Sequence, residues 1–134
     1  MFYKIVKQLE KRLYCFKKSL FSRFFFKFSS YYQIHIIGHQ HPSSCIDSWS
    51  IVYYNIVNRY ENIIVGQFFG HSHSDYFNVF YDLSNTTRAT NVLYIGGSVT
   101  TYSNLNPAYR IYTVDGNYSA SSFRVLGSLK KYVI

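Results

Sequence analysis

Apolar residues follow two different periods along this chain, and the change of period separates the predicted elements. Between residues 1 and 28, apolar side chains recur every three to four residues, with most Lys and Arg side chains between them. This spacing predicts an amphipathic basic helix. Its apolar positions are Phe2, Ile5, Val6, Leu9, Leu13, Phe16, Leu20 and Phe24. Beyond residue 33, short apolar runs bounded by polar turns predict strands instead.

One helix is expected among these strands. It begins with Asp47 or Ser48 as the capping residue and runs to about Tyr60. Its apolar face consists of Trp49, Val52, Tyr53, Ile56, Val57 and Tyr60. Strands are predicted at 34–38, 63–69, 76–81, 92–95 and 109–114, and the segments 123–126 and 132–134 are expected to close the same sheet. With a polar loop at 83–90 and a hairpin-type turn at Asp115-Gly116, this pattern predicts an α/β fold.

Two of the predicted strands end in Gly-His. Gly38-His39 ends the first, and Gly70-His71-Ser72-His73 ends the second. Histidine is the commonest metal ligand, and a preceding glycine favours a sharp turn of the backbone. If the two strands are neighbours, His39, His71 and His73 converge at the carboxyl edge of the sheet, where open α/β sheets commonly place their sites. His71 and His73 share one side if the segment stays extended. The pattern predicts a metal site.

The other chemistry-bearing side chains have simpler interpretations. His35 lies between isoleucines and is predicted to be a hydrogen-bonded core residue rather than a ligand. His41 is predicted to be a surface residue rather than an additional ligand. Helix capping, loop solvation and turn formation explain the carboxylates of Asp47, Asp75, Asp82 and Asp115.

The positive charge of the chain is concentrated in its first thirty residues. The net charge is +8 over 134 residues. Residues 1–30 hold eight basic side chains and one acidic side chain, a net charge of +7, whereas residues 31–134 hold six and five, or +1. Nucleic-acid binding has no support outside this segment, which is suited to contact with an anionic membrane. Charges interrupt each apolar run, so the segment is predicted to be neither a cleavable signal peptide nor a membrane span.

Beyond residue 33 the chain carries an ordered series of motifs. They are Gly38-His39, Trp49-Ser50, and residues 53–62, 67–73, 79–82, 100–102, 105–110 and 115–119. Their order, from residue 34 to about 126, resembles the acid sphingomyelinase group of calcineurin-like metallophosphoesterases. The resemblance implies that residues 34–134 are the C-terminal part of that domain, a partial metallophosphoesterase sandwich with one packing helix. Residues 1–33 have no counterpart in the group and form a separate segment.

The resemblance implies a zinc-dependent phosphodiesterase that cleaves sphingomyelin to ceramide and phosphocholine. His39 and His71 would bind one zinc ion and His73 the other, and Tyr102 is a candidate to line the substrate groove. In the group, the remaining ligands and the proton donor precede Gly38-His39, so the isolated chain is expected to be incomplete and inactive. The alternatives are a non-catalytic fragment that binds a membrane or a partner through the basic N-terminal helix, and a remnant that binds no metal.

The resemblance also implies a secreted or lysosomal setting. In that setting the sequons Asn85-Thr86-Thr87 and Asn117-Tyr118-Ser119 are candidate N-glycosylation sites. The group's counterpart of Cys45 pairs with a cysteine upstream. Because Cys15 lies outside the matched region, Cys45 is expected to be unpaired.

Overall fold

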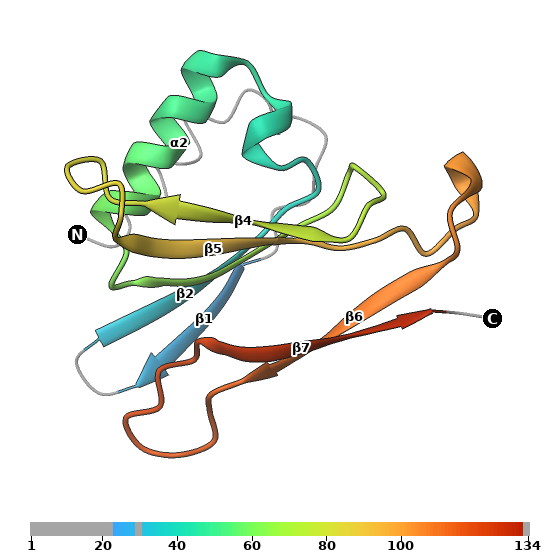
Figure 1. The fold of residues 1–134 in the computed structure, drawn as a ribbon. Helices are drawn as coiled ribbons and strands as arrows, with labels where there is room; N and C mark the ends of the chain where they lie inside the picture. Colours follow the sequence, from blue (N-terminus) through green and yellow to red (C-terminus); the bar gives the residue numbers. More distant parts are fainter. Residues whose placement is uncertain (1–22, 29–30, 133–134) are drawn as a thin grey trace.

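The computed structural model describes residues 23–28 and 31–132, which form two sheets, one α-helix and two short 3-10 helices (Figure 1). The elements in chain order are β1 (Arg23–Phe28), β2 (Tyr31–Ile37), η2 (Pro42–Ser44), α2 (Asp47–Arg59), β3 (Ile64–Phe69), β4 (Tyr76–Tyr81), β5 (Ala89–Ile95), η3 (Tyr102–Asn104), β6 (Ala108–Val114) and β7 (Val125–Tyr132). The predicted α/β class is confirmed. No helix in the described part of the chain is long and apolar enough to cross a membrane.

The larger sheet has the strand order β1-β2-β3-β5-β4. Its central strands β2, β3 and β5 are parallel, and β1 and β4 pair antiparallel at the two edges. Parallel neighbours need a crossover connection. Helix α2 provides it between β2 and β3 and covers one face of the sheet (Figure 1). The carboxyl ends of β2 and β3 therefore lie at the same edge.

The core fills the space between α2 and this sheet. Its buried residues are Ile36, Trp49, Tyr53, Val57, Ile64, Phe69, Phe80, Leu93 and Ile95. The rings of Trp49 and Tyr53 stack at 5.2 Å, and Tyr53 meets Phe80 edge-on at 6.3 Å. The predicted apolar face of the helix is thus the face that packs, with Trp49, Tyr53 and Val57 buried.

The helix is confirmed over nearly the predicted range, but its N-terminus differs from the prediction. Ile46 is the N-cap residue and makes no side-chain capping bond. Asp47 lies in the first turn, where its negative charge is favoured by the exposed N–H groups of the helix end. The assignment of Asp47 or Ser48 as the cap was therefore wrong by one or two residues.

Residues Arg23–Phe28 form strand β1, so the helix predicted over residues 1–28 is wrong for this stretch. The segment is rich in phenylalanine, which fits a pleated surface, and it pairs antiparallel with β2 from Arg23↔Ile36 to Phe28↔Tyr31. Strand β2 begins at Tyr31, three residues before the predicted start of this strand at residue 34. The rest of the predicted helix, residues 1–22, lies outside the described residues.

Strands β6 and β7 form a separate two-stranded antiparallel sheet on the face of the larger sheet away from α2 (Figure 1). The segments 123–126 and 132–134 were predicted to be strands that close the larger sheet, and this is wrong: one strand, β7, runs from Val125 to Tyr132 and pairs with β6 in the separate sheet. Residues 133–134 lie outside the described residues. A two-stranded sheet is marginally stable by itself. Here Tyr112 of β6 packs against Phe68 at 4.8 Å and Tyr94 at 5.3 Å, which joins the two sheets.

A chain of buried polar side chains links α2, β3 and β5 through the core. Tyr53 donates its hydroxyl to Gln67 Oε1 at 2.7 Å, and Gln67 Nε2 donates to Asn91 Oδ1 at 2.9 Å. Asn91 Nδ2 in turn donates to the backbone carbonyl of Ile64 at 2.6 Å. Burial raises the pKa of Tyr53, so its hydroxyl stays protonated as a donor. Because each of these buried side chains has a hydrogen-bond partner, the series Tyr53–Gln67–Asn91 specifies how α2, β3 and β5 align.

We expect Gln67→Met to lower the free energy of unfolding by about 1–3 kcal/mol, because it leaves the Tyr53 hydroxyl and the Asn91 amide without their buried partner. Urea denaturation followed by circular dichroism measures the change. Asn55→Met on the exposed side of α2 is the matched control, with an expected change within about 0.5 kcal/mol. Equal effects of the two substitutions would contradict a structural role for the buried hydrogen bonds of Gln67.

Candidate metal centre at the carboxyl edge of the sheet

His39 and His71 lie side by side just beyond the ends of β2 and β3. The pairing of these strands continues past their ends, because Gly38 N–H donates to Phe68 O at 3.0 Å and Gly70 N–H donates to His39 O at 2.9 Å. His39 Nε2 and His71 Nδ1 are 3.4 Å apart. Two imidazole ligands of a tetrahedral zinc ion, each about 2.0–2.1 Å from it, are separated by about 3.3 Å. The spacing of the pair therefore fits two nitrogen ligands of one ion.

His73 lies on the same turn but contacts a different partner. Its ring meets that of Tyr102 edge-on at 5.5 Å, and its carbonyl accepts a hydrogen bond from Ser98 N–H at 3.1 Å. Within the described residues, no three His, Cys, Asp or Glu side chains form a group that could hold a metal ion. The structure thus brings together two of the three predicted ligands. The roles assigned to His73 and Tyr102 stay predictions.

The conformation of this turn differs from the prediction. His71 and His73 have φ angles of 77° and 61°, in the left-handed region, whereas no described glycine has a positive φ. The segment is therefore not extended, and Gly70 is not the residue that provides the sharp turn. A left-handed residue with a side chain costs about 1 kcal/mol or more, so the surroundings must hold both histidines in place.

His41 is a buried neighbour of the pair, and its prediction as a surface residue is wrong. It is 5% exposed, and its ring lies 6.4 Å from that of His71. The 3-10 turn η2 folds the chain back, so that Ser43 Oγ contacts Nδ1 at 2.8 Å and Ser44 Oγ contacts Nε2 at 2.7 Å. Tyr76 adds its hydroxyl at 3.3 Å from Nε2. Burial, together with the charge of the nearby His71, lowers the pKa of His41.

His35 points away from this cluster and is hydrogen-bonded, as predicted. Its Nε2 lies 2.7 Å from the carbonyl oxygen of Phe123, and its ring meets that of Phe68 edge-on at 5.4 Å. It therefore helps to join the larger sheet to the segment that precedes β7. A structural role accounts for this histidine.

Comparison with known proteins relates the described chain to one group of relatives. No family model matches the chain. It is 55% identical over 94 residues to the sphingomyelin phosphodiesterase of Bos taurus and 54% identical over 94 residues to that of Homo sapiens, and each match covers 70% of this chain and 15% of the relative. It is also 47% identical over 93 residues to sphingomyelin phosphodiesterase B of Dictyostelium discoideum, covering 63% of this chain and 15% of that protein. Over the matched stretch, the chain belongs to the sphingomyelin phosphodiesterase family.

The chain therefore spans about 15% of the length of these sphingomyelin phosphodiesterases. The family relationship agrees with the resemblance inferred from the ordered motifs beyond residue 33. Of the three histidines in those motifs, His39 and His71 form the close pair, and His73 lies on the same turn as His71.

Asp75 anchors the histidine turn of this family member to the second sheet. Its side chain is 5% exposed and forms ion pairs with Arg110 of β6 and, at 3.5 Å, with Lys130 of β7. Loop solvation, the predicted explanation for Asp75, is therefore wrong. Because Asp75 follows His73 by two residues, the ion pairs fix the end of the turn that carries both left-handed histidines. The β6–β7 sheet thus contributes to the geometry of the site.

Asp82 and Asp115 agree with their structural predictions. Asp82 accepts bonds from Ser84 and from Arg88 Nε at 2.9 Å within the loop that follows β4. Asp115 accepts bonds from Ser122 N at 2.7 Å and from the hydroxyl of Tyr118, which close the connection between β6 and β7. These hydrogen bonds lower the pKa of Asp115.

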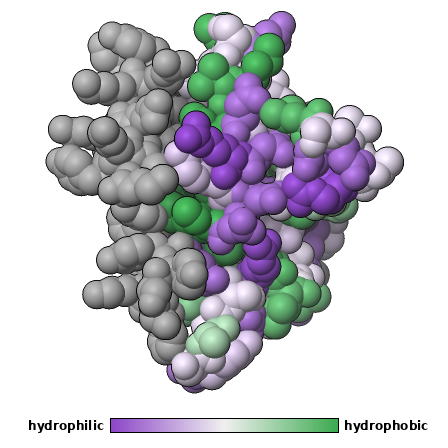
Figure 2. Space-filling model, turned by 90° about the vertical axis from the view of Figure 1, so that its left-hand side faces the viewer, coloured by the Kyte–Doolittle hydropathy of each residue, from purple (hydrophilic) through white to green (hydrophobic). Residues whose placement is uncertain are grey.

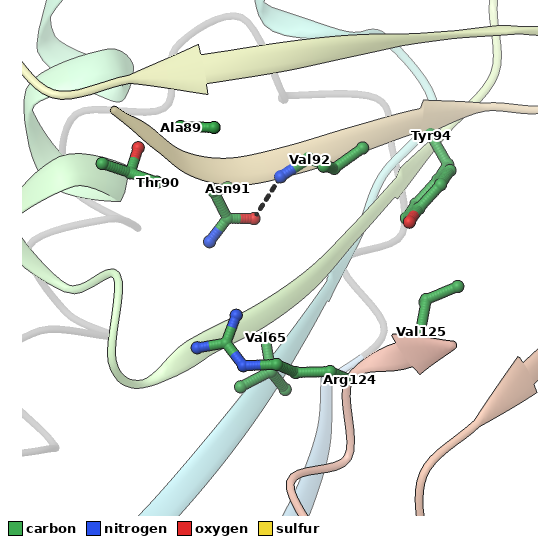
Figure 3. Close-up of a pocket in the computed structure, with 8 residues that line it drawn as sticks. All are labelled: Val65, Ala89, Thr90, Asn91, Val92, Tyr94, Arg124 and Val125. Atoms are coloured by element: carbon green, nitrogen blue, oxygen red, sulfur yellow. Dashed lines mark hydrogen bonds between the residues drawn. The ribbon is translucent and has the colours of Figure 1, made fainter. Parts of the chain in front are cut away.

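A pocket of about 200 Å³ lies apart from the histidines, between β5 and the start of β7. Figure 3 shows the side chains of Asn91 and Tyr94 on the β5 side of it, with Arg124 and Val125 on the other side. Asn91 already bonds Val92 N–H at 2.9 Å and the carbonyl of Ile64. No imidazole lines this pocket, so it does not belong to the candidate metal centre.

We expect Arg110→Met to lower the free energy of unfolding by about 3–5 kcal/mol, because it leaves the buried Asp75 carboxylate with Lys130 alone. Thermal and urea denaturation measure the change. The matched control is Arg124→Met, since Arg124 is exposed and makes one long bond of 3.5 Å to Glu61 O. An effect of Arg110→Met no larger than that of the control would show that the ion pairs do not hold the sheets together.

Proposed function

We propose that this chain contributes part of the metal centre of a sphingomyelin phosphodiesterase. The observation that carries the proposal is the pair of ring nitrogens, His39 Nε2 and His71 Nδ1, 3.4 Å apart at the ends of adjacent parallel strands. The relatives are sphingomyelin phosphodiesterases, which supports sphingomyelin as the substrate. The proposed reaction is zinc-dependent hydrolysis of sphingomyelin to ceramide and phosphocholine by the complete site, to which the isolated chain brings an incomplete set of ligands.

The donor set of this chain suits zinc. Neutral imidazole nitrogens are favoured zinc ligands, and their separation here is that of two ligands on one ion. We assign His39 and His71 to one zinc ion and His73 to a second. When bound, zinc polarises a phosphoryl oxygen and lowers the pKa of its water. The protein's own contribution is orientation, because the backbone bonds Gly38 N–Phe68 O and Gly70 N–His39 O hold the two loops together.

Tyr102 is the candidate substrate-lining residue of this chain. Tyr102 is 72% exposed, and its ring meets that of His73 edge-on. The face of a tyrosine ring attracts a quaternary ammonium group, which is the charged end of phosphocholine. We propose that Tyr102 lines the groove beside the metal site and receives this end of the headgroup.

The arrangement of layers supports the proposed fold. The β6–β7 sheet faces the five-stranded sheet on the side opposite α2, and the contacts of Tyr112 with Phe68 and Tyr94 join them. Two facing sheets with a helix outside one of them are consistent with the second half of a metallophosphoesterase sandwich.

We propose a secreted or lysosomal setting for the chain. The candidate acceptor Asn85 is exposed in the loop after β4, and Asn117 is exposed in the β6–β7 connection with a φ of 68°. Both side chains are therefore accessible to a glycosyltransferase.

Titration of the purified chain with zinc tests the metal assignment. We expect binding to weaken at least about ten-fold in His39→Ala and in His71→Ala, because each removes one of two nitrogen ligands. Calorimetry and competition with a chromophoric chelator measure the affinity. His35→Gln is the matched control, since the Nε2 atom of His35 lies against the carbonyl oxygen of Phe123 and not beside the His39–His71 pair. Equal zinc affinity in all variants would refute the proposal.

Expression with a secretion signal tests whether the two candidate acceptors are glycosylated. We expect Asn85→Gln and Asn117→Gln each to remove one glycan, because each sequon is exposed. Glycosidase treatment and intact-mass measurement count the glycans. Asn62→Gln, an exposed asparagine without a sequon, is the control. An unmodified secreted chain would contradict the assignment of these residues as acceptors.

A further inference from the structure

The pocket between β5 and the start of β7 combines a cationic edge with apolar walls. Its apolar walls are Val65, Val92, Tyr94 and Val125. Arg124 and Thr90 line it as well, and no Asp or Glu of the described residues does. We propose that the pocket binds a small amphipathic anion, whose charged group contacts Arg124 and Thr90 and whose short apolar part lies against the valines. The inference does not depend on the zinc assignment, because no imidazole of the described residues lines the pocket.

A bulge in β5 places Thr90 at this pocket. Phe80 of β4 pairs with Asn91 of β5, and the next residue of β4, Tyr81, pairs with Ala89. Thr90 is therefore the extra residue of a bulge, a feature that re-aims side chains and is common beside functional sites. Within the described residues, Thr90 Oγ1 is buried and has no hydrogen-bond partner. A buried hydroxyl without a partner is costly, so it points to a ligand that supplies one.

Arg124 brings a positive charge that the described residues leave largely unused. Among them, its side chain makes one hydrogen bond, from Nη2 to the carbonyl oxygen of Glu61, and this bond is 3.5 Å long. The carboxylate of Glu61 pairs with Arg88 at 3.2 Å. Figure 3 shows the guanidinium group of Arg124 on the side of the pocket opposite Tyr94. A guanidinium group presents a planar fork of N–H donors that matches the oxygens of a carboxylate or a phosphate.

The apolar wall of the pocket is held in place by its neighbours. Tyr94 stacks on Phe68 at 5.7 Å and meets Tyr112 edge-on at 5.3 Å. A wall that is already fixed by packing loses little conformational freedom when a ligand binds. The pocket, of about 200 Å³, is smaller than the roughly 300–1,000 Å³ of pockets that enclose drug-sized ligands. The apolar part of the anion is therefore limited to a short chain.

The pocket lies toward the end of the molecule where β5 begins, at the left of Figure 1. The Gly-His turns follow the opposite, carboxyl ends of β2 and β3. Figure 2 views the molecule from the left of Figure 1 and shows hydrophilic surface through the centre of the view, with hydrophobic patches around it. Polar and apolar surfaces adjoin at this end, which suits a ligand with one charged and one apolar part.

Titration of the full chain with hexanoate, followed by amide NMR spectra in the presence of EDTA, tests the proposal. We expect saturable binding that shifts the amide signals of Val92 and Val125. Hexanamide has the same chain without the charge, and acetate has the charge without most of the chain. Both should bind at least about ten-fold more weakly. A parallel titration with hexyl phosphate identifies the anionic group, and tighter binding of either anion than of hexanamide supports the site.

Two substitutions test the assigned contacts. Arg124→Met should weaken hexanoate binding at least about ten-fold, because it removes a charge-assisted hydrogen bond. Lys131→Met is the matched control, since it removes one positive charge at the other end of β7 and should leave the affinity unchanged. Thr90→Val should weaken binding about five-fold and raise the thermal midpoint of the unliganded chain, because it removes the unpartnered hydroxyl. His71→Ala should bind hexanoate as the unaltered chain does.

The outcomes that would overturn the proposal are distinct from failure of the zinc assignment. They are an absence of saturable binding, equal affinities of Arg124→Met and Lys131→Met, and an unchanged affinity of Thr90→Val. A Thr90→Val chain with a lowered thermal midpoint and unchanged hexanoate affinity would show that the hydroxyl is structural and that the assigned contact is wrong.

Discussion

The parallel pairing of β2 with β3 is the constraint on which the candidate site depends. The register Ile37↔Phe68 and the two backbone bonds beyond it bring the Gly-His loops together at the carboxyl edge. A slip of one residue would displace one Gly-His loop along the other by about 3.3 Å and separate the two imidazoles. Parallel neighbours also require a crossover, which α2 provides over one face. The 3.4 Å contact between two imidazoles is therefore a consequence of long-range topology rather than of either loop alone.

The core holds this register by two kinds of interaction. Apolar packing of α2 on the sheet contributes most of the stability, but it is non-directional and does not by itself fix how the helix is aligned on the strands. The buried chain Tyr53–Gln67–Asn91 adds directional bonds from α2 through β3 to β5, and these are satisfied in one alignment of the three elements. Because an unpaired buried amide is costly, the polar chain disfavours alternative alignments more than it adds to overall stability.

The sequence predicted the elements whose signals are local. The alternating and helical periods located α2 and strands β2 to β6, and the paired Gly-His ends predicted the His39–His71 contact. Local signals were insufficient elsewhere. Phe24 fits a helical stripe, yet Arg23–Phe28 is a strand because it pairs with β2. Gly127-Ser128 resembles a break, yet pairing with β6 carries β7 through it. His41 is buried partly by Tyr76, which lies 35 residues away, so its environment depends on the tertiary fold.

The left-handed turn shows why His73 could not be placed from its spacing to His71. Both residues have positive φ, so the alternation of an extended strand does not apply between them. What holds the turn lies outside it: Ser98 N–H binds the His73 carbonyl, and Arg110 and Lys130 bind Asp75. All three of these contacts reach the second sheet or the loop that leads into it. The position of the His73 imidazole relative to the His39–His71 pair is therefore set by how the β6–β7 sheet docks. A metal site built here is assembled by both sheets, although its ligands all follow strands of one.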